Sequence, residues 1–174
     1  MIEKNSVKLK FTNKKKFDIM PTSEENFMKI VVQKVKKSVL YSEGKKYSEI
    51  KNGMLVLVGI TTDDTKQVAT KVAQKILKLR IFDDENGKTN KSVFDIGGEI
   101  MVVSNFTLYG NLKGTNRPDF INSARPEVAE PLYDFLVEEL RKEINVATGV
   151  FQTEMEIEMI ADGPGTYIYE ERAN

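Results

Sequence analysis

Residues 154–160, EMEIEMI, alternate strictly between acidic and apolar side chains. In an extended chain Met155, Ile157 and Met159 point to one side, and the three glutamates point to the other. This period of two predicts a strand with one face against a core and the other face toward water. The fold must therefore contain a sheet that is covered on at least one face.

Three further segments have the character of strands. MKIVVQKVKKSVLY (28–41) is rich in Val and Ile, and NGMLVLVGI (52–60) is a short apolar run that follows an Asn-Gly turn signal. We expect these two strands to pair with each other. EIMVVSNFTLYG (99–110) predicts another strand, whose apolar run is interrupted at Ser104 and Asn105.

Two segments have the spacing of amphipathic helices. The first follows Asp63 or Asp64, either of which can cap it, and the second begins near Pro126. The apolar stripes expected to face the core are Val68, Val72, Ile76 and Leu79 in the first helix and Val128, Leu132, Phe135, Leu136 and Leu140 in the second. Strands followed by a helix, twice in succession, predict a single α+β domain with mixed or antiparallel sheets.

The chain contains no Cys, His or Trp among its 174 residues. Disulfides and thiol nucleophiles are therefore excluded, and so are Ser-His-Asp and Cys-His catalytic arrangements. A zinc site would consist of carboxylates alone, which is unusual. If the protein is an enzyme, its chemistry must come from hydroxyls, carboxylates, Lys, backbone amides or the substrate itself. We expect neither a metal nor a cofactor.

Charge is distributed unevenly along the chain, although the net charge is zero. Residues 1–126 carry 23 basic and 14 acidic side chains, whereas residues 127–174 carry 3 basic and 12 acidic ones. A basic face of this kind suits a polyanion, but segregated charges are also found on ordinary solvated surfaces. Both interpretations stay open at this point.

Residues 1–27 contain six Lys and little apolar periodicity. They predict a flexible Lys-rich extension, followed by a domain at 28–174. No run of residues approaches the ~18 apolar residues of a membrane span, and no apolar stretch near Met1 has the form of a secretory signal. The expected location is the cytoplasm.

Ser104 and Asn105 are the first candidate site residues, because polar side chains inside an apolar strand need partners or a cleft. They mark either a bulged strand with two satisfied side chains or a site that opens onto a cleft. In the second case the hydroxyls of Ser104 and Thr107 and the backbone amides nearby form a possible oxyanion site.

Three other segments also allow two interpretations each. The loop 110–120, which holds Lys113 and Arg117, is either a plain surface loop or a phosphate-binding loop. Phe151 and Met155 either pack in the core or flank a planar group. The tripeptide 163–165, Gly-Pro-Gly, forms either a tight turn between two strands or a cis bond that points carbonyls at a ligand.

Taken together, five segments resemble the D-aminoacyl-tRNA deacylase family: VVQKV (31–35), LRIFDDENGK (79–88), VVSNFTLYG (102–110), GTNRPDF (114–120) and ADGPGT (161–166). They occur in the family's order and spacing. The resemblance implies an editing enzyme that hydrolyses the ester between a D-amino acid, or glycine mischarged on tRNA-Ala, and the 3′-terminal adenosine of tRNA. It also implies that residues 28–174 form a deacylase domain and that the protein is a homodimer whose subunits share active sites.

The resemblance assigns roles to individual residues. The family's Ser-Gln-Phe-Thr motif is matched by Ser104, Asn105, Phe106 and Thr107. Backbone amides near this motif are implied to stabilise the oxyanion. The 2′-OH of the tRNA is implied to assist hydrolysis in place of a protein base.

The family's Gly-cis-Pro pair is matched by Gly163 and Pro164. This pair is implied to enter the partner subunit's pocket, where its carbonyls meet the amino group and exclude an L side chain. Phe151 and Met155 are implied to line the pocket for the terminal adenine.

Three positions depart from the family pattern. Asn105 stands in place of Gln, Ala161 in place of the usual Asn, and Gly165 in place of the usual Val. These departures leave the substrate range open. The alternative to an editing enzyme is a noncatalytic nucleic-acid-binding member of the same fold.

Overall fold

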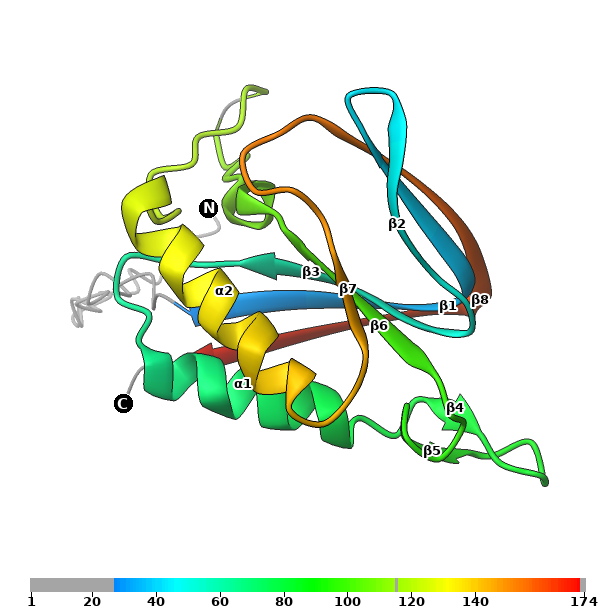
Figure 1. The fold of residues 1–174 in the computed structure, drawn as a ribbon. Helices are drawn as coiled ribbons and strands as arrows, with labels where there is room; N and C mark the ends of the chain where they lie inside the picture. The colour runs from blue at the N-terminus through cyan, green and yellow to red at the C-terminus, as the bar shows by residue number, and fades with distance from the viewer. Residues whose placement is uncertain (1–26, 115, 173–174) are drawn as a thin grey trace, which may run out of the picture.

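The computed structural model describes residues 27–114 and 116–172, and Figure 1 shows one large sheet with two helices packed side by side on one of its faces. The strands of this sheet are β1 (Phe27–Ser42), β2 (Lys45–Ile50), β3 (Gly53–Gly59), β6 (Glu99–Ser104), β7 (Val146–Thr148) and β8 (Met155–Arg172). The helices are α1 (Lys66–Lys78), α2 (Pro126–Arg141) and the short 3-10 helix η1 (Phe106–Tyr109), while β4 (Phe82–Asp83) and β5 (Thr89–Lys91) form a separate hairpin. The extension predicted at 1–27 lies outside the described residues, except for Phe27.

The sheet is mixed, with the order β2-β1-β3-β6-β7 and with β8 paired to β1. β1 is antiparallel to β2, β3 and β8. Its pairing with β3 confirms the pairing predicted between segments 28–41 and 52–60. β3 and β6 are parallel, and so are β6 and β7. Parallel neighbours need a crossover connection, and α1 and α2 lie in the two connections concerned. The predicted α+β domain with two main helices is confirmed.

The start of α1 differs from the prediction. Thr65, and neither Asp63 nor Asp64, is the N-cap residue: its hydroxyl accepts a hydrogen bond from the Val68 amide at 3.3 Å. The Asp64 carboxylate instead accepts from the Thr61 amide at 2.8 Å and closes the preceding loop. Three successive residues were able to cap the helix, and the path of the loop decided which of them does.

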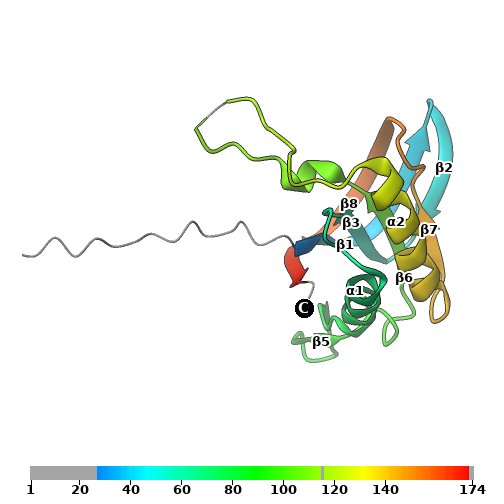
Figure 2. The ribbon, with the colours of Figure 1, turned by 90° about the vertical axis from the view of Figure 1, so that its left-hand side faces the viewer.

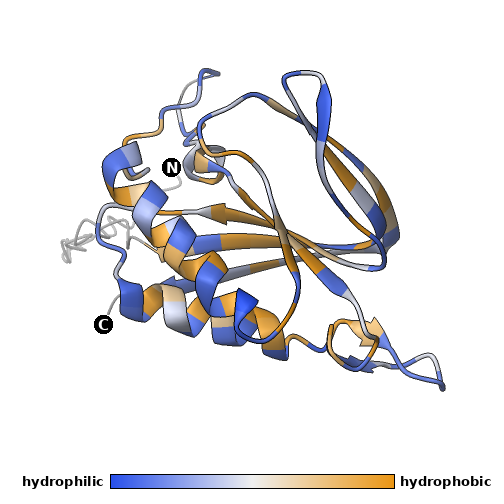
Figure 3. Cartoon of the chain, in the orientation of Figure 1, coloured by the Kyte–Doolittle hydropathy of each residue, from blue (hydrophilic) through white to orange (hydrophobic). Residues whose placement is uncertain are grey.

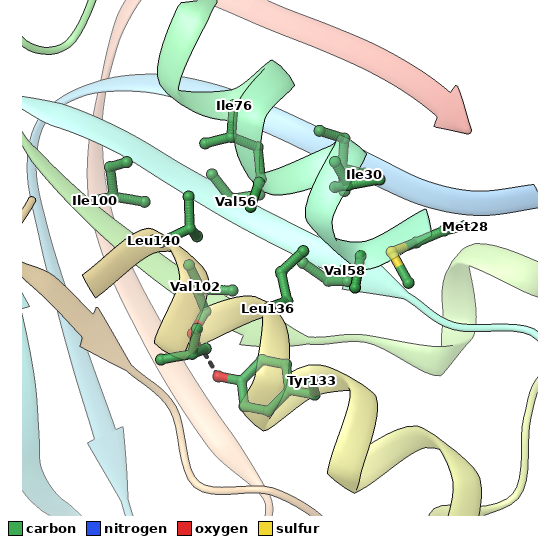
Figure 4. Close-up of a cluster of buried hydrophobic side chains, with 14 of the residues drawn as sticks. Met28, Ile30, Val56, Val58, Ile76, Ile100, Val102, Tyr133, Leu136 and Leu140 are labelled. Carbon is green, nitrogen blue, oxygen red and sulfur yellow. Dashed lines mark hydrogen bonds between the residues drawn. The ribbon is translucent and has the colours of Figure 1, made fainter. Parts of the chain in front are cut away.

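The main core lies between the two helices and the sheet. Figure 3 shows the apolar sides of both helices turned toward the strands, and Figure 4 shows buried side chains from β1, β3, β6, α1 and α2 in contact. Tyr133 on α2 reaches into this core, where its hydroxyl donates to the Val102 carbonyl at 2.8 Å and burial raises the pKa of the hydroxyl. Of the predicted stripes, Leu79 lies beyond the end of α1 and Val128 is exposed.

The opposite face of the sheet carries a second, smaller apolar cluster. Its buried members come from β1, β2, β3 and β6, and Met155 and Ile157 of β8 pack against them. The exposed fractions of Met159, Ile160 and Ile168 on β8 are 44%, 58% and 73%. The predicted half-buried strand is present, but β8 leaves more apolar surface in contact with water than its sequence pattern suggests.

β8 is one continuous strand, so of the two interpretations of 163–165 the tight turn is wrong. In its pairing with β1, Gln33 lies opposite Thr166 and Val35 lies opposite Ala161. Residues 162–165 therefore bulge out opposite Lys34 and do not reverse the chain. The Gly163–Pro164 peptide bond in this bulge is cis, as the resemblance implied. Among the described residues, no helix has both the length and the apolar character needed to cross a membrane.

Candidate functional site

A groove of about 820 Å³ opens between η1, the start of α2 and the segment before β8. Figure 2, which turns the molecule, shows η1 and the first turn of α2 at the same end of the sheet. Five of the predicted site residues line this groove: Ser104, Asn105, Phe106, Phe151 and Met155. Three others are not among its lining residues: Thr107, Gly163 and Pro164.

The interruption at Ser104 and Asn105 is a change from strand to helix. β6 ends at Ser104, and the Asn105 amide donates to the Val58 carbonyl at 2.7 Å. The Asn105 side chain then caps η1, because its Oδ1 accepts from the Thr107 amide at 3.0 Å and also from the Thr107 hydroxyl. The strand was predicted to continue to residue 110, but residues 106–109 form a 3-10 helix instead. The Asn105 side chain bonds to the backbone amide of Thr107, which favours the helix over an extended strand. The Thr107 hydroxyl therefore already donates a hydrogen bond to the capping Asn105 side chain.

Phe106 lines the groove and has a backbone amide without a partner among the described residues. It is the first residue of η1, where a helix leaves amides without an acceptor inside the helix. No hydrogen bond within the described part of the chain involves the Phe106 amide. The Phe106 ring is 56% exposed and packs edge-on against Phe120, with the ring centroids 4.9 Å apart. A residue whose backbone N–H donor is unpaired within the described ranges thus lines the same groove as Ser104.

Phe151 and Met155 form an apolar wall of the same groove. The Phe151 ring lies 6.1 Å from the Tyr133 ring, and the Met155 sulfur accepts from the Val150 amide at 3.4 Å. A Cβ added at Gly149 would lie only 2.7 Å from the Met155 sulfur. Glycine at this position therefore lets Met155 lie against the backbone. The two side chains are both half-buried, which suits contact with a flat apolar ligand.

The groove is almost free of charge. Among the described residues that line it, Arg125 alone has a charged side chain, and none is Asp, Glu or Lys. Sequence reasoning missed Arg125, and it also missed the lining residues Phe120, Ser123 and Gln152. The one signal for Arg125 was its position directly before Pro126, where a helix was predicted to begin and where Arg is an unusual cap. The loop 110–120, interpreted either as a plain surface loop or as a phosphate-binding loop, closes with an Asn111–Asp119 bridge and contributes Phe120 to the groove.

The bulge that carries Gly163 and Pro164 is held by an ion-pair cluster. Lys34 is buried beneath it, and its Nζ lies 3.2 Å from Asp83 and 3.3 Å from Asp162. Burial lowers the pKa of Lys34, but hydrogen bonds to the two carboxylates and their charges raise it, and its pKa lies above the ordinary value. Asp162, the residue before Gly163, is thereby tied to β1 and to the β4–β5 hairpin.

Asp64 is a buried carboxyl group outside the lining of the groove. Burial raises its pKa to about 6, and the hydrogen bond from the Thr61 amide opposes this shift only in part. The folded state therefore binds this proton more tightly than the unfolded chain does. The stabilisation that the proton provides is complete below about pH 4 and is lost as the pH rises through about 6.

Asp64→Asn is expected to increase the free energy of unfolding relative to the wild type at neutral pH, with the increase shrinking toward about pH 4. The amide keeps an acceptor oxygen for Thr61 and removes the buried charge. Urea unfolding at several pH values between these limits measures the difference. Asp63→Asn, at the exposed neighbouring position, controls for the change in net charge. A difference that is the same at every pH would contradict the assignment.

Known proteins resemble the chain over most of its length. The family model described as D-Tyr-tRNA(Tyr) deacylase matches residues 31–170. The chain belongs to the D-aminoacyl-tRNA deacylase family. It is 44% identical over 146 residues to the D-aminoacyl-tRNA deacylase of Bacillus cytotoxicus and 45% identical over 146 residues to that of Bacillus cereus. Each match covers 83% of this chain and 100% of the relative. The family predicted from the sequence is confirmed.

Solved structures are also similar to the chain in fold. One is called the c-Myc DNA Unwinding Element Binding Protein, with a TM-score of 0.79 and 41% identity, covering 84% of this chain and 100% of that one. Another, described as a probable eukaryotic D-amino acid tRNA deacylase, has a TM-score of 0.73 and 17% identity, covering 83% of this chain and 99% of that one. The second likeness concerns the fold alone.

Proposed function

We propose that the groove of this chain, a D-aminoacyl-tRNA deacylase, holds the 3′-terminal aminoacyl-adenosine of tRNA and hydrolyses its ester. Esters of D-amino acids, and of glycine mischarged on tRNA-Ala, are the substrates, and L-amino acids are rejected. The observation that carries the proposal is the meeting of Ser104, Asn105 and Phe106 with Phe151 and Met155 in one groove. The ester lies at the first group, and the adenine lies against the second.

The chemistry of the groove fits a reaction assisted by the substrate. Water attacks the ester carbonyl, and the carbonyl oxygen gains negative charge where the Phe106 amide can donate to it. No described lining residue has a side chain that accepts a proton near neutral pH. The 2′-OH of the terminal ribose, adjacent to the ester, therefore assists the attack in place of a protein base.

The rejection of L-amino acids is assigned to a partner subunit. Gly163 and Pro164 are exposed and lie outside the groove of their own chain. The exposed apolar side chains of β8 provide a surface that a second copy would cover. In this homodimer the Gly163–Pro164 carbonyls of each subunit reach the partner's groove, meet the α-amino group and leave no space for an L side chain.

Incubation with D-tyrosyl-tRNA and L-tyrosyl-tRNA tests the proposed function. The D ester is expected to be lost about 10²-fold faster than the L ester, because steric exclusion acts on only one of the two. Both rates are compared with hydrolysis in buffer alone. Equal loss of the two esters would contradict the proposal.

A second candidate function is noncatalytic nucleic-acid binding. It is favoured by the likeness to the protein named for binding a DNA unwinding element and by the excess of basic residues in 1–126. In this case the protein binds tRNA with an affinity that falls steeply with salt and leaves both esters intact. Removal of residues 1–26, which precede β1, separates binding through this segment from activity of the domain.

A further inference from the structure

The groove contains a single charged side chain among its described lining residues, that of Arg125. The substrate end of an aminoacyl-tRNA has two charges of opposite sign. One is the α-ammonium group of the amino acid, and the other is the phosphate that joins the terminal adenosine to the rest of the tRNA. A lone cation in an otherwise uncharged groove attracts the phosphate and repels the ammonium group, so it distinguishes the two ends of the ligand.

Arg125 stands where a cation is locally unfavourable. It is the N-cap residue of α2, and its side chain makes no capping hydrogen bond. Ser, Thr, Asp and Asn are preferred there because their oxygens accept from the free amides, whereas a guanidinium group has only donors. The positive end of the helix dipole lies beside it. Exceptions to local rules of this kind are expected at functional sites.

The Arg125 guanidinium group is available to a ligand, and backbone hydrogen bonds hold residues 124 and 125 in place. Arg125 is exposed, and no hydrogen bond or ion pair of its side chain is found within the described part of the chain. The Arg125 carbonyl accepts from the Ala129 amide at 2.9 Å, and the amide of the preceding, buried Ala124 donates to the Ile60 carbonyl at 2.9 Å. The side chain therefore starts from a fixed point on the wall of the groove.

The position along α2 suits one nucleotide. Arg125 and Tyr133 are eight residues apart, or about 12 Å along a helix axis. The Tyr133 ring contacts the ring of Phe151, against which the adenine is placed. A long, flexible guanidinium side chain and the sugar-phosphate of one nucleotide together bridge this separation.

We infer that Arg125 is a substrate-positioning residue that binds the phosphate 5′ to the terminal adenosine. The inference rests on the proposed function, because it takes the adenine to lie against Phe151. Bound in this way, the phosphate directs the aminoacyl ester toward Phe106 and away from the cation. The Arg side chain acts through placement of the substrate and takes no part in bond making.

Two substrates with the same ester distinguish phosphate binding by Arg125 from an effect of Arg125 on the ester itself. D-tyrosyl-tRNA carries the phosphate, and D-tyrosyl-adenosine lacks it. Arg125→Ser is expected to lower kcat/KM for the tRNA about five- to tenfold, mainly through KM, and to leave kcat/KM for the adenosine ester unchanged. Arg125→Lys, which keeps the charge, is expected to retain most of the activity on tRNA.

The matched control is Lys88→Ser in the β4–β5 hairpin, at the opposite end of the molecule from the start of α2 (Figure 1). It removes one exposed positive charge and is expected to leave the ratio of the two kcat/KM values unchanged. Arg125→Ser also introduces a good cap, so its Tm is expected to rise slightly while its activity on tRNA falls. If Arg125 had a purely structural role, its substitution would lower the Tm and the activity on tRNA together.

Binding of adenosine 5′-monophosphate and of adenosine, measured by calorimetry, gives a readout that needs no activity. The wild type is expected to bind the monophosphate more tightly than adenosine, and Arg125→Ser is expected to bind the two equally. An equal fall in kcat/KM on both esters, or no preference for the monophosphate in the wild type, overturns the inference. A wild type that hydrolyses neither ester contradicts the proposed function, and the nucleotide comparison then still decides the role of Arg125.

Discussion

Phe106→Pro is expected to lower kcat for D-tyrosyl-tRNA about 10²- to 10³-fold relative to Phe106→Ala, the usual effect of losing one oxyanion donor. Both variants lose the aromatic ring, but only proline also removes the backbone N–H. Proline suits the first position of a helix, and the preceding Asn105, with φ of −143° and ψ of 93°, lies outside the α region that a following proline disfavours. The comparison therefore isolates the amide.

Single-turnover hydrolysis measures the effect, because it reports the chemical step without product release. The two variants should have similar Tm values, which shows that η1 is retained in both. Equal rates for Phe106→Pro and Phe106→Ala would mean that the Phe106 amide is not the donor to the oxyanion. The Ser104 hydroxyl would then be the next group in the groove to test.

Combining two weakly active variants, Phe106→Pro and Gly163→Val, in one heterodimer is expected to restore D-tyrosyl-tRNA hydrolysis to about half of the wild-type rate. Gly163 has a φ of +114°, and a Cβ there would lie 2.9 Å from the Gly165 amide nitrogen. Valine therefore disturbs the bulge without touching the groove of its own chain. In a heterodimer with shared sites, one site contains both defects and the other contains neither.

The exchange is made by co-expression with two different affinity tags, and the doubly tagged species is isolated and assayed. Each variant carried through the same procedure alone is the control and should stay weakly active. Purified heterodimers without recovered activity would contradict the shared site. A monomeric protein with full stereoselectivity would contradict the proposed role of the partner subunit.

Local signals predicted those elements whose ends depend on nearby residues. The helix at Pro126 begins at the proline because the missing N–H is not needed there, and the alternation from Met155 to Ile157 puts both side chains on the buried side of β8. The cap at Thr65 was missed because Asp63 and Asp64 have equal capping ability, and only the loop that joins Asp64 to Thr61 distinguishes them.

Distant contacts decided the rest of the fold. The Gly-Pro-Gly tripeptide permits a turn, but pairing of β8 along the whole length of β1 keeps the chain extended and leaves a bulge over Lys34. Gly53 shows the same dependence. Its neighbour in the parallel pair is Glu99, whose carbonyl oxygen would lie 1.9 Å from a Cβ added at Gly53. The residues near Gly53 in the sequence do not predict this contact.

The candidate site divides in the same way. The sequence by itself determined the family and therefore its motif residues, and the absence of His and Cys limited the chemistry to amides, hydroxyls and the substrate. Only the tertiary structure placed Arg125 in the groove and left Thr107 out of its lining. The physical reason is that a motif specifies which groups are present, whereas their distances depend on strands and helices that are far apart in the chain and meet only in the fold.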